Sequence, residues 1–66
     1  MSFLLKDVTL PTVWSLLGRY DTHEQALDAL RKMNPKYIME DEMYPFFVDA
    51  MGKDGRIFVI EPDQIA

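Results

Sequence analysis

The clearest alternation of side-chain character in the chain lies between Thr12 and Tyr20. Every second residue falls on the same side of an extended segment, which gives two sets: Trp14, Leu16, Gly18, Tyr20 and Val13, Ser15, Leu17, Arg19. A period of two with aromatic and branched residues is typical of a β-strand. We expect Gly18 to mark a bulge or the close approach of the helix, because glycine packs no side chain within a strand.

The next segment carries the signals of a helix. Thr22 is a favourable N-cap with Gln25 three residues later, and Asp21 with Glu24 offers the same capping box one residue earlier. An apolar stripe at helical spacing follows, with charged residues on the opposite side: Ala26, Leu27, Ala29, Leu30 and Met33 against Asp28, Arg31 and Lys32. We expect the helix to end before Pro35, because proline disfavours helical backbone at the residue before it.

The second half of the chain predicts a short strand and a hairpin. Residues 37–39 form the short strand, and residues 46–51 and 56–61 form the arms of the hairpin. The arms are joined by residues 52–55, whose two glycines supply the positive φ angles that a tight turn requires. We expect Pro62 to stop the last strand.

Proline also constrains two further segments. Residues 1–10 are apolar but show no regular pattern, and Pro11 breaks any element that would run through them. Pro45 fits only the beginning of a strand or the edge of a sheet.

The elements together predict an α+β fold in a single domain of residues 1–66. A chain of 66 residues has room for one hydrophobic core. We expect a small two-layer domain in which one helix packs on an antiparallel sheet of three to four strands, in the order strand, helix, strand, strand. The strand at residues 37–39 is either short or merged with the strand after it.

Apolar side chains occur on both faces of the predicted sheet. In the first hairpin arm, one face carries Phe46, Val48 and Ala50, and the other carries Phe47 and Met51. A single short helix covers one face of a sheet, and each large apolar side chain left in water forgoes about 1.5–3 kcal/mol. We therefore expect the second face to be covered by residues 3–10, by a second copy of the chain or by a different protein.

Composition and charge exclude several classes of function. The chain has no cysteine, which excludes disulfides and thiolate zinc sites, and its one histidine cannot build a histidine-rich metal site. Seven basic and eleven acidic residues give a net charge of −4, which opposes direct nucleic-acid binding. Residues 1–39 carry five basic and four acidic side chains, a balance of +1, whereas residues 40–66 carry two and seven, a balance of −5.

The apolar runs in the chain are short. None is long enough to span a membrane, and the start of the chain lacks the basic head and the length of a secretory signal. We expect a cytoplasmic protein without a membrane partner and without a cofactor.

Catalysis has little support in the sequence. His23 falls at the first helical positions, where we expect a solvated surface residue. Ser2 and Ser15 have no histidine at the spacing of a known nucleophile, and Gly52 and Gly55 join two strands instead of opening a helix as a phosphate loop does. We therefore expect neither an enzyme nor catalytic residues.

The run Glu40-Asp41-Glu42 is the one charge cluster that could act chemically. It lacks the spacing of an EF-hand, so we expect no metal site there. Two interpretations remain for these carboxylates. They form either a solvated turn that keeps a sheet edge from pairing, or a surface that recognises a basic partner.

The preferred hypothesis is a protein-binding module that docks on a basic, nucleic-acid-handling site of a larger protein and inhibits or regulates it. Charge steers such encounters, and aromatic side chains supply much of the affinity. The residues expected to contact the partner are Glu40, Asp41, Glu42, Tyr44, Asp49 and Asp54. In size, acidity and lack of cysteine, the chain is similar in general make-up to short phage-encoded inhibitors of host enzymes, including those that block transcription or CRISPR defence. The alternative is a homodimer joined through an apolar sheet face or an edge strand.

Overall fold

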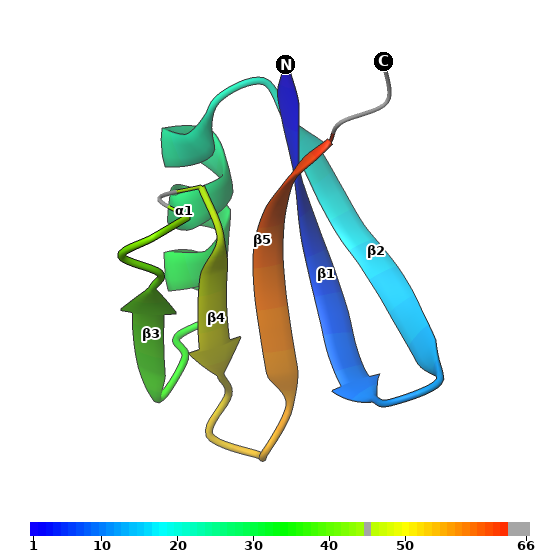
Figure 1. Ribbon diagram of the computed structural model, residues 1–66. Helices are drawn as coiled ribbons and strands as arrows, with labels where there is room; N and C mark the ends of the chain where they lie inside the picture. The colour runs from blue at the N-terminus through cyan, green and yellow to red at the C-terminus, as the bar shows by residue number, and fades with distance from the viewer. Residues whose placement is uncertain (45, 64–66) are drawn as a thin grey trace.

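Five antiparallel strands and one helix form the fold in the computed structural model, which describes residues 1–44 and 46–63 (Figure 1). In chain order the elements are β1 (Ser2–Leu10), β2 (Val13–Tyr20), α1 (His23–Lys32), β3 (Tyr37–Glu40), β4 (Val48–Met51) and β5 (Ile57–Asp63). The α+β class is confirmed, whereas the expected three to four strands and their order are wrong, because residues 1–10 supply a strand of their own. Pro45, expected at the start or edge of a strand, lies outside the described residues.

β1 lies inside the sheet and not across its second face. It pairs with β2 on one side and with β5 on the other, so that Leu5 lies between Gly18 and Ile60. Phe3 and Leu5 are buried in the core. Of the three alternatives for covering the second face, the one with residues 3–10 is therefore wrong, because strand pairing holds this segment within the sheet itself.

The last strand of the chain occupies the middle of the sheet. The strand order is β2-β1-β5-β4-β3, so β5 joins the β1–β2 hairpin to the β3–β4 hairpin (Figure 1). The core lies between α1 and one face of this sheet and consists of Phe3, Leu5, Ala26, Leu27, Leu30, Val48, Ala50, Phe58 and Ile60. Within the described residues it contains no polar or charged side chain.

Local signals set both ends of α1. The Thr22 Oγ1 accepts a hydrogen bond from the Gln25 backbone N–H at 3.1 Å, and the Gln25 side-chain oxygen accepts one from the Thr22 N–H at 3.2 Å. The capping box is thus confirmed, with Thr22 as the N-cap. After the helix, Asn34 has a φ of 54°, a left-handed conformation that asparagine tolerates, and Pro35 follows it.

β2 contains a β-bulge, which is one of the two features that Gly18 was expected to mark. Gly18 lies opposite Leu5, but Leu16, two residues away, lies opposite Lys6, the immediate neighbour of Leu5. Leu17 is therefore the extra residue of the bulge. Because side chains alternate between the two faces of a strand, the extra residue changes which residues share a face.

The bulge separates residues that were expected to lie together. Tyr20 packs against the core and over Gly18, where a β-carbon would lie 2.5 Å from the Tyr20 hydroxyl oxygen. Trp14 lies on the face away from α1, where the Lys6 Nζ is 4.1 Å from the centroid of its ring. The expected set of Trp14, Leu16, Gly18 and Tyr20 is thus divided between two faces.

The hairpin of the second half is present with shifted bounds. β4 begins at Val48, two residues later than expected, and β5 runs through Pro62 to Asp63. The pairing of β4 with β5 ends at Val48 and Ile60, so Pro62 interrupts no ladder on the β4 side and the strand continues past it. Of the two turn glycines one, Gly55, has a positive φ, of 87°.

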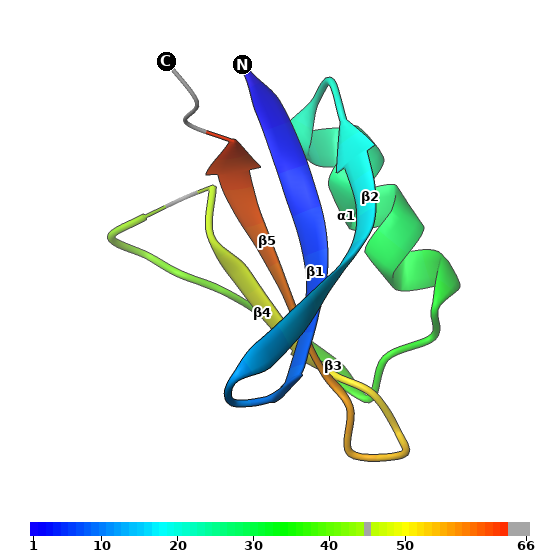
Figure 2. The same ribbon diagram turned by 90° about the vertical axis from the view of Figure 1, so that its right-hand side faces the viewer.

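The sheet face away from α1, called the open face below, is not covered by the helix (Figure 2). In both views the turn between β1 and β2 lies far from α1 (Figures 1 and 2). Large apolar side chains at that end are exposed: Leu10 by 63%, Val13 by 61%, Trp14 by 56% and Leu16 by 50%. The excess of exposed apolar surface that the sequence predicted is therefore present, and part of it lies at the β1–β2 end of the sheet.

Candidate functional site

The loop between β3 and β4 is organised around the Asp41 carboxylate. Its Oδ1 accepts hydrogen bonds from the backbone N–H groups of Met43 at 2.8 Å and Tyr44 at 3.1 Å. The Asp41 N–H donates to the Phe47 carbonyl oxygen at 3.1 Å, and the Phe47 N–H donates to the Tyr44 carbonyl oxygen at 2.9 Å. These bonds close the loop, because they satisfy backbone groups that no strand pairs. Asp41 therefore has a structural role as well as a charge.

Four carboxylates gather beside this loop around an open hollow of about 610 Å³. The end of β3 and the residues after it supply Glu40, Asp41 and Glu42, and the first turn of α1 supplies Glu24. Glu24 was not among the expected contact residues. Its place beside residues 40–42 results from tertiary packing, for which the sequence offers no local signal.

An aromatic pair lies next to these carboxylates. The rings of Tyr44 and Phe47 meet edge to face with their centroids 5.8 Å apart, and both side chains are exposed. Together with Asp41 and Asp49 they line a second hollow, of about 420 Å³. Since Asp41 lines both hollows, the two groups form one acidic–aromatic surface, which consists of Glu24, Glu40, Asp41, Glu42, Tyr44, Phe47 and Asp49.

Asp54 lies away from the acidic–aromatic surface. It belongs to the turn between β4 and β5, where its Oδ1 accepts a hydrogen bond from the Arg56 backbone N–H at 3.2 Å. The length of β4 separates this turn from the β3–β4 loop (Figure 1). Five of the six residues expected to contact a partner are therefore brought together, and Asp54 is not among them. Phe47 was missed, although its position beside Phe46 in an aromatic-rich segment is a usable signal.

His23 is partly buried and packed against two aromatic rings, whereas a solvated surface residue was expected. Its ring meets Phe3 and Phe46 edge to face, with centroid distances of 5.4 Å and 5.8 Å. Its Nε2 is buried and has no hydrogen-bond partner within the described part of the chain. The three rings join the start of α1 to β1 and to the loop before β4, so His23 contributes to packing.

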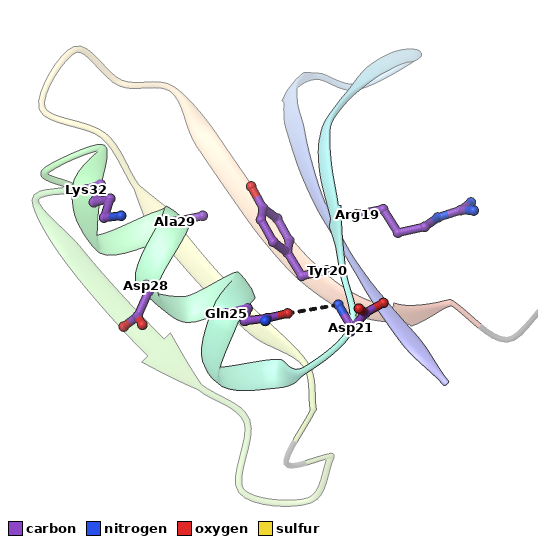
Figure 3. Close-up of a pocket in the computed structure, with 7 residues that line it drawn as sticks. All are labelled: Arg19, Tyr20, Asp21, Gln25, Asp28, Ala29 and Lys32. Carbon is purple, nitrogen blue, oxygen red and sulfur yellow. Dashed lines mark hydrogen bonds between the residues drawn. The ribbon is translucent and has the colours of Figure 1, made fainter.

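Another hollow, of about 400 Å³, lies between β2 and α1 (Figure 3). Gln25 uses its side-chain oxygen to accept a hydrogen bond from the Asp21 backbone N–H at 3.1 Å, which belongs to the helix cap. Arg19 points away from the other side chains drawn, on the far side of β2 from Tyr20 (Figure 3). The polar groups do not converge on a common point, so we assign no function to this hollow.

The Asp7 carboxyl group has a pKa below its ordinary value. Hydrogen bonds from Thr9, followed by one from Arg56, lower the pKa of Asp7 from 3.8 to about 2. The carboxylate is consequently held charged in an ion pair with Arg56, at 2.6 Å between Asp7 Oδ2 and Arg56 Nη2. Such a group links β1 to the residue before β5 and is poorly suited to transfer protons near neutral pH.

Residues 1–44 and 46–63 contain no group of three or more His, Asp or Glu side chains placed to hold a metal ion. The helix within these residues is too short and too polar to cross a bilayer.

Comparison of the chain with protein-family models, with curated proteins and with solved structures found no match.

Proposed function

We propose that the chain is a small acidic protein-binding module that docks on a basic, nucleic-acid-handling site of a larger protein and inhibits or regulates that protein. The observation that carries the proposal is the adjacency of carboxylates and exposed aromatic rings, with Asp41 lining both hollows. Sites that handle nucleic acids present lysine and arginine to phosphate groups. Carboxylates form charge-assisted hydrogen bonds with the same side chains, so they compete for the same site.

The two kinds of side chain have different parts in such docking. Exposed carboxylates speed and orient the encounter, and salt weakens this effect. Tyr44 and Phe47 provide apolar area that a partner can bury, in the manner of aromatic anchors at interfaces. The hydrogen bonds from the Met43 and Tyr44 N–H groups to Asp41 restrain the backbone at these two residues, which reduces the entropy lost on binding.

Charge reversal at the acidic–aromatic surface tests the proposal. Partners are captured on the immobilised protein from an extract of its native cells, and the affinity for the captured protein is measured at low and at physiological salt. We expect the pair Glu40→Lys and Glu42→Lys to weaken binding at least about tenfold, because it places positive charge against a basic site. Asp41 is left unchanged, since its replacement would also open the loop.

A second pair of substitutions, away from the acidic–aromatic surface, controls for the change in net charge. Asp21→Lys with Asp28→Lys alters the total charge equally at exposed positions beside the hollow between β2 and α1, and should change affinity by less than about threefold. Tyr44→Ala should weaken binding without changing its dependence on salt, because it removes no charge. Equal losses of affinity in the two charge-reversed pairs, or no loss in either, would contradict this surface as the docking site. A chain that captures no partner contradicts the proposal as a whole.

A further inference from the structure

The two edges of the sheet differ in how well they are protected from pairing with a strand of another chain. Within the described residues, β2 and β3 are the edge strands. An edge strand presents unpaired N–H and C=O groups, and proteins usually shorten it or protect it with charged residues or proline. β3 has four residues and ends in Glu40, the first of the acidic residues 40–42, whereas β2 has eight residues. The β3 edge is therefore protected from pairing, whereas the β2 edge is long and accessible.

β2 has one of the features that prevent sheets from pairing, the bulge at Leu17, but it has neither a charged residue nor a proline at residues 13–17. Residues 13–17 are all exposed and uncharged, and four of these five are apolar. The charged residue of β2, Arg19, lies near the end of the strand and forms an ion pair with Asp63, at 3.1 Å between Nη2 and Oδ2. Pairing along residues 13–17 would consequently bury no unpaired charge.

Trp14 is already held in position at this edge. The Lys6 Nζ lies 4.1 Å from the centroid of the Trp14 ring, and Lys6 is itself fixed by an ion pair with Glu61. More than half of the Trp14 surface is still exposed. A large side chain that is oriented before binding loses little entropy, and tryptophan is enriched at the energetic centres of interfaces.

We propose that a second copy of this chain pairs antiparallel with β2, so that the two sheets join into one continuous sheet. Antiparallel pairing suits two identical strands, because a two-fold axis perpendicular to the sheet lets the same residues of both copies contact each other. In this arrangement the Trp14 and Leu16 side chains of each copy lie beside the partner's strand on the open face.

Charge and symmetry favour a second copy over another occupant. β1 and β2 together carry Lys6 and Arg19 against Asp7, whereas residues 40–42 lie beyond the opposite edge. Pairing through β2 places the two acidic edges at the far ends of the joined sheet. Neighbouring strands are about 4.8 Å apart, so the acidic edges are separated by much more than the Debye length of about 8 Å at physiological salt. The acidic–aromatic surface stays accessible, so this inference does not depend on the proposed function.

The area required indicates which residues take part. A stable protein interface buries about 800 Å² from each partner, which is about a sixth of the 4743 Å² accessible surface of the chain. Reaching that area requires the exposed side chains at the β1–β2 end, Leu10 and Val13 among them, in addition to the strand backbone. We therefore include the whole end of the β1–β2 hairpin in the interface.

Sedimentation equilibrium over a range of concentrations tests the inference. We expect the wild type to approach twice the chain mass of 7.7 kDa, with a Kd on the order of micromolar and little dependence on salt. Leu16→Lys should raise the Kd at least about tenfold, because it brings a positive charge from each copy close to the two-fold axis. Met39→Lys makes the same kind of change at an exposed position of β3 and should leave the Kd unchanged.

Hydrogen exchange provides a readout that needs no variant. The amides of residues 13–17 should exchange more slowly above the Kd than below it, whereas those of residues 37–40 should not change. Circular dichroism shows whether Leu16→Lys is folded, and Val13→Lys replaces it if it is not. The inference is overturned if the wild type stays monomeric at millimolar concentration, if the lysine in β2 leaves the Kd unchanged, if Met39→Lys raises the Kd equally, or if exchange at residues 13–17 is independent of concentration.

Discussion

At the scale of single residues, Asp7 links the β1–β2 hairpin to the start of β5. Its Oδ1 accepts hydrogen bonds from the Thr9 N–H at 2.9 Å and the Thr9 hydroxyl at 2.5 Å, and its Oδ2 accepts two from the Arg56 guanidinium, at 2.6 Å and 3.1 Å. These donors favour the charged carboxylate in the folded chain, and the pKa of Asp7 falls to about 2 for that reason. The Thr9 hydroxyl in turn accepts a hydrogen bond from the Ile57 N–H at 2.9 Å.

A pKa that is lower in the folded state than in the unfolded state makes stability depend on pH. The contribution of Asp7 should be fully present above its ordinary pKa of 3.8 and should be lost as the pH falls from about 4 to about 2. We expect Asp7→Asn to lower the free energy of unfolding by about 1 kcal/mol or less at pH 7, because the Arg56 side of the ion pair is exposed to solvent. Urea unfolding at several pH values checks this, with Asp49→Asn on the open face as the control. A difference between Asp7→Asn and wild type that stays constant from pH 5 to pH 2 would show that the ion pair has no such role.

At the scale of elements, α1 was predictable and β1 was not. The start of α1 depends on Thr22 and Gln25, which are three residues apart, so its signal is local. β1 shows no clean alternation because the apolar Leu4 stands between the buried residues Phe3 and Leu5, and its pairing partner β5 comes from the other end of the chain. The bulge beside Gly18 was only partly predictable from the sequence. The glycine marks its place, but the register with β1 decides which side chains change face.

The capping box yields a prediction for α1. Thr22→Ala removes the acceptor for the Gln25 N–H and should lower the free energy of unfolding by about 1 kcal/mol. Thr12→Ala, in the exposed turn between β1 and β2, makes the same chemical change away from any helix end and should alter it by less than about 0.5 kcal/mol. Thermal and urea unfolding measure both variants, and equal costs would mean that the cap contributes nothing specific.

At the scale of the whole molecule, stability depends on one small core. A chain of 66 residues is expected to unfold with a free energy of about 3–10 kcal/mol. The core joins side chains from both ends of the chain, since Leu5 of β1 lies opposite Ile60 of β5 and both pack in the same cluster as Leu30 of α1. Cooperative unfolding is the expected consequence, because removal of any one of these elements exposes the others.

Truncation at the centre of this core measures that dependence. Leu30 is fully buried, and Leu30→Ala should lower the free energy of unfolding by about 2–5 kcal/mol, a large part of the total. Met43→Ala, at a side chain exposed by 81%, should change it by less than about 0.5 kcal/mol. Urea unfolding followed by circular dichroism gives both values, and a cost below about 1 kcal/mol for Leu30→Ala is incompatible with the core described.

The sequence alone determined the features that depend on neighbouring residues and on composition. These are the capping box at Thr22, the bulge at Gly18, the positive φ at Gly55, the acidic second half and the surplus of apolar side chains. It also showed most of the carboxylates and aromatic rings of the acidic–aromatic surface, because they are close together in the chain.

Only the tertiary structure decided which distant segments meet. Insertion of β5 between β1 and β4 made residues 1–10 an interior strand and left β2 as an edge. Packing of α1 brought Glu24 to residues 40–42 and His23 between Phe3 and Phe46, while the length of β4 kept Asp54 apart. The physical reason is that local signals act over a few residues, whereas strand pairing and burial are selected by the total free energy of contacts between segments far apart in the chain.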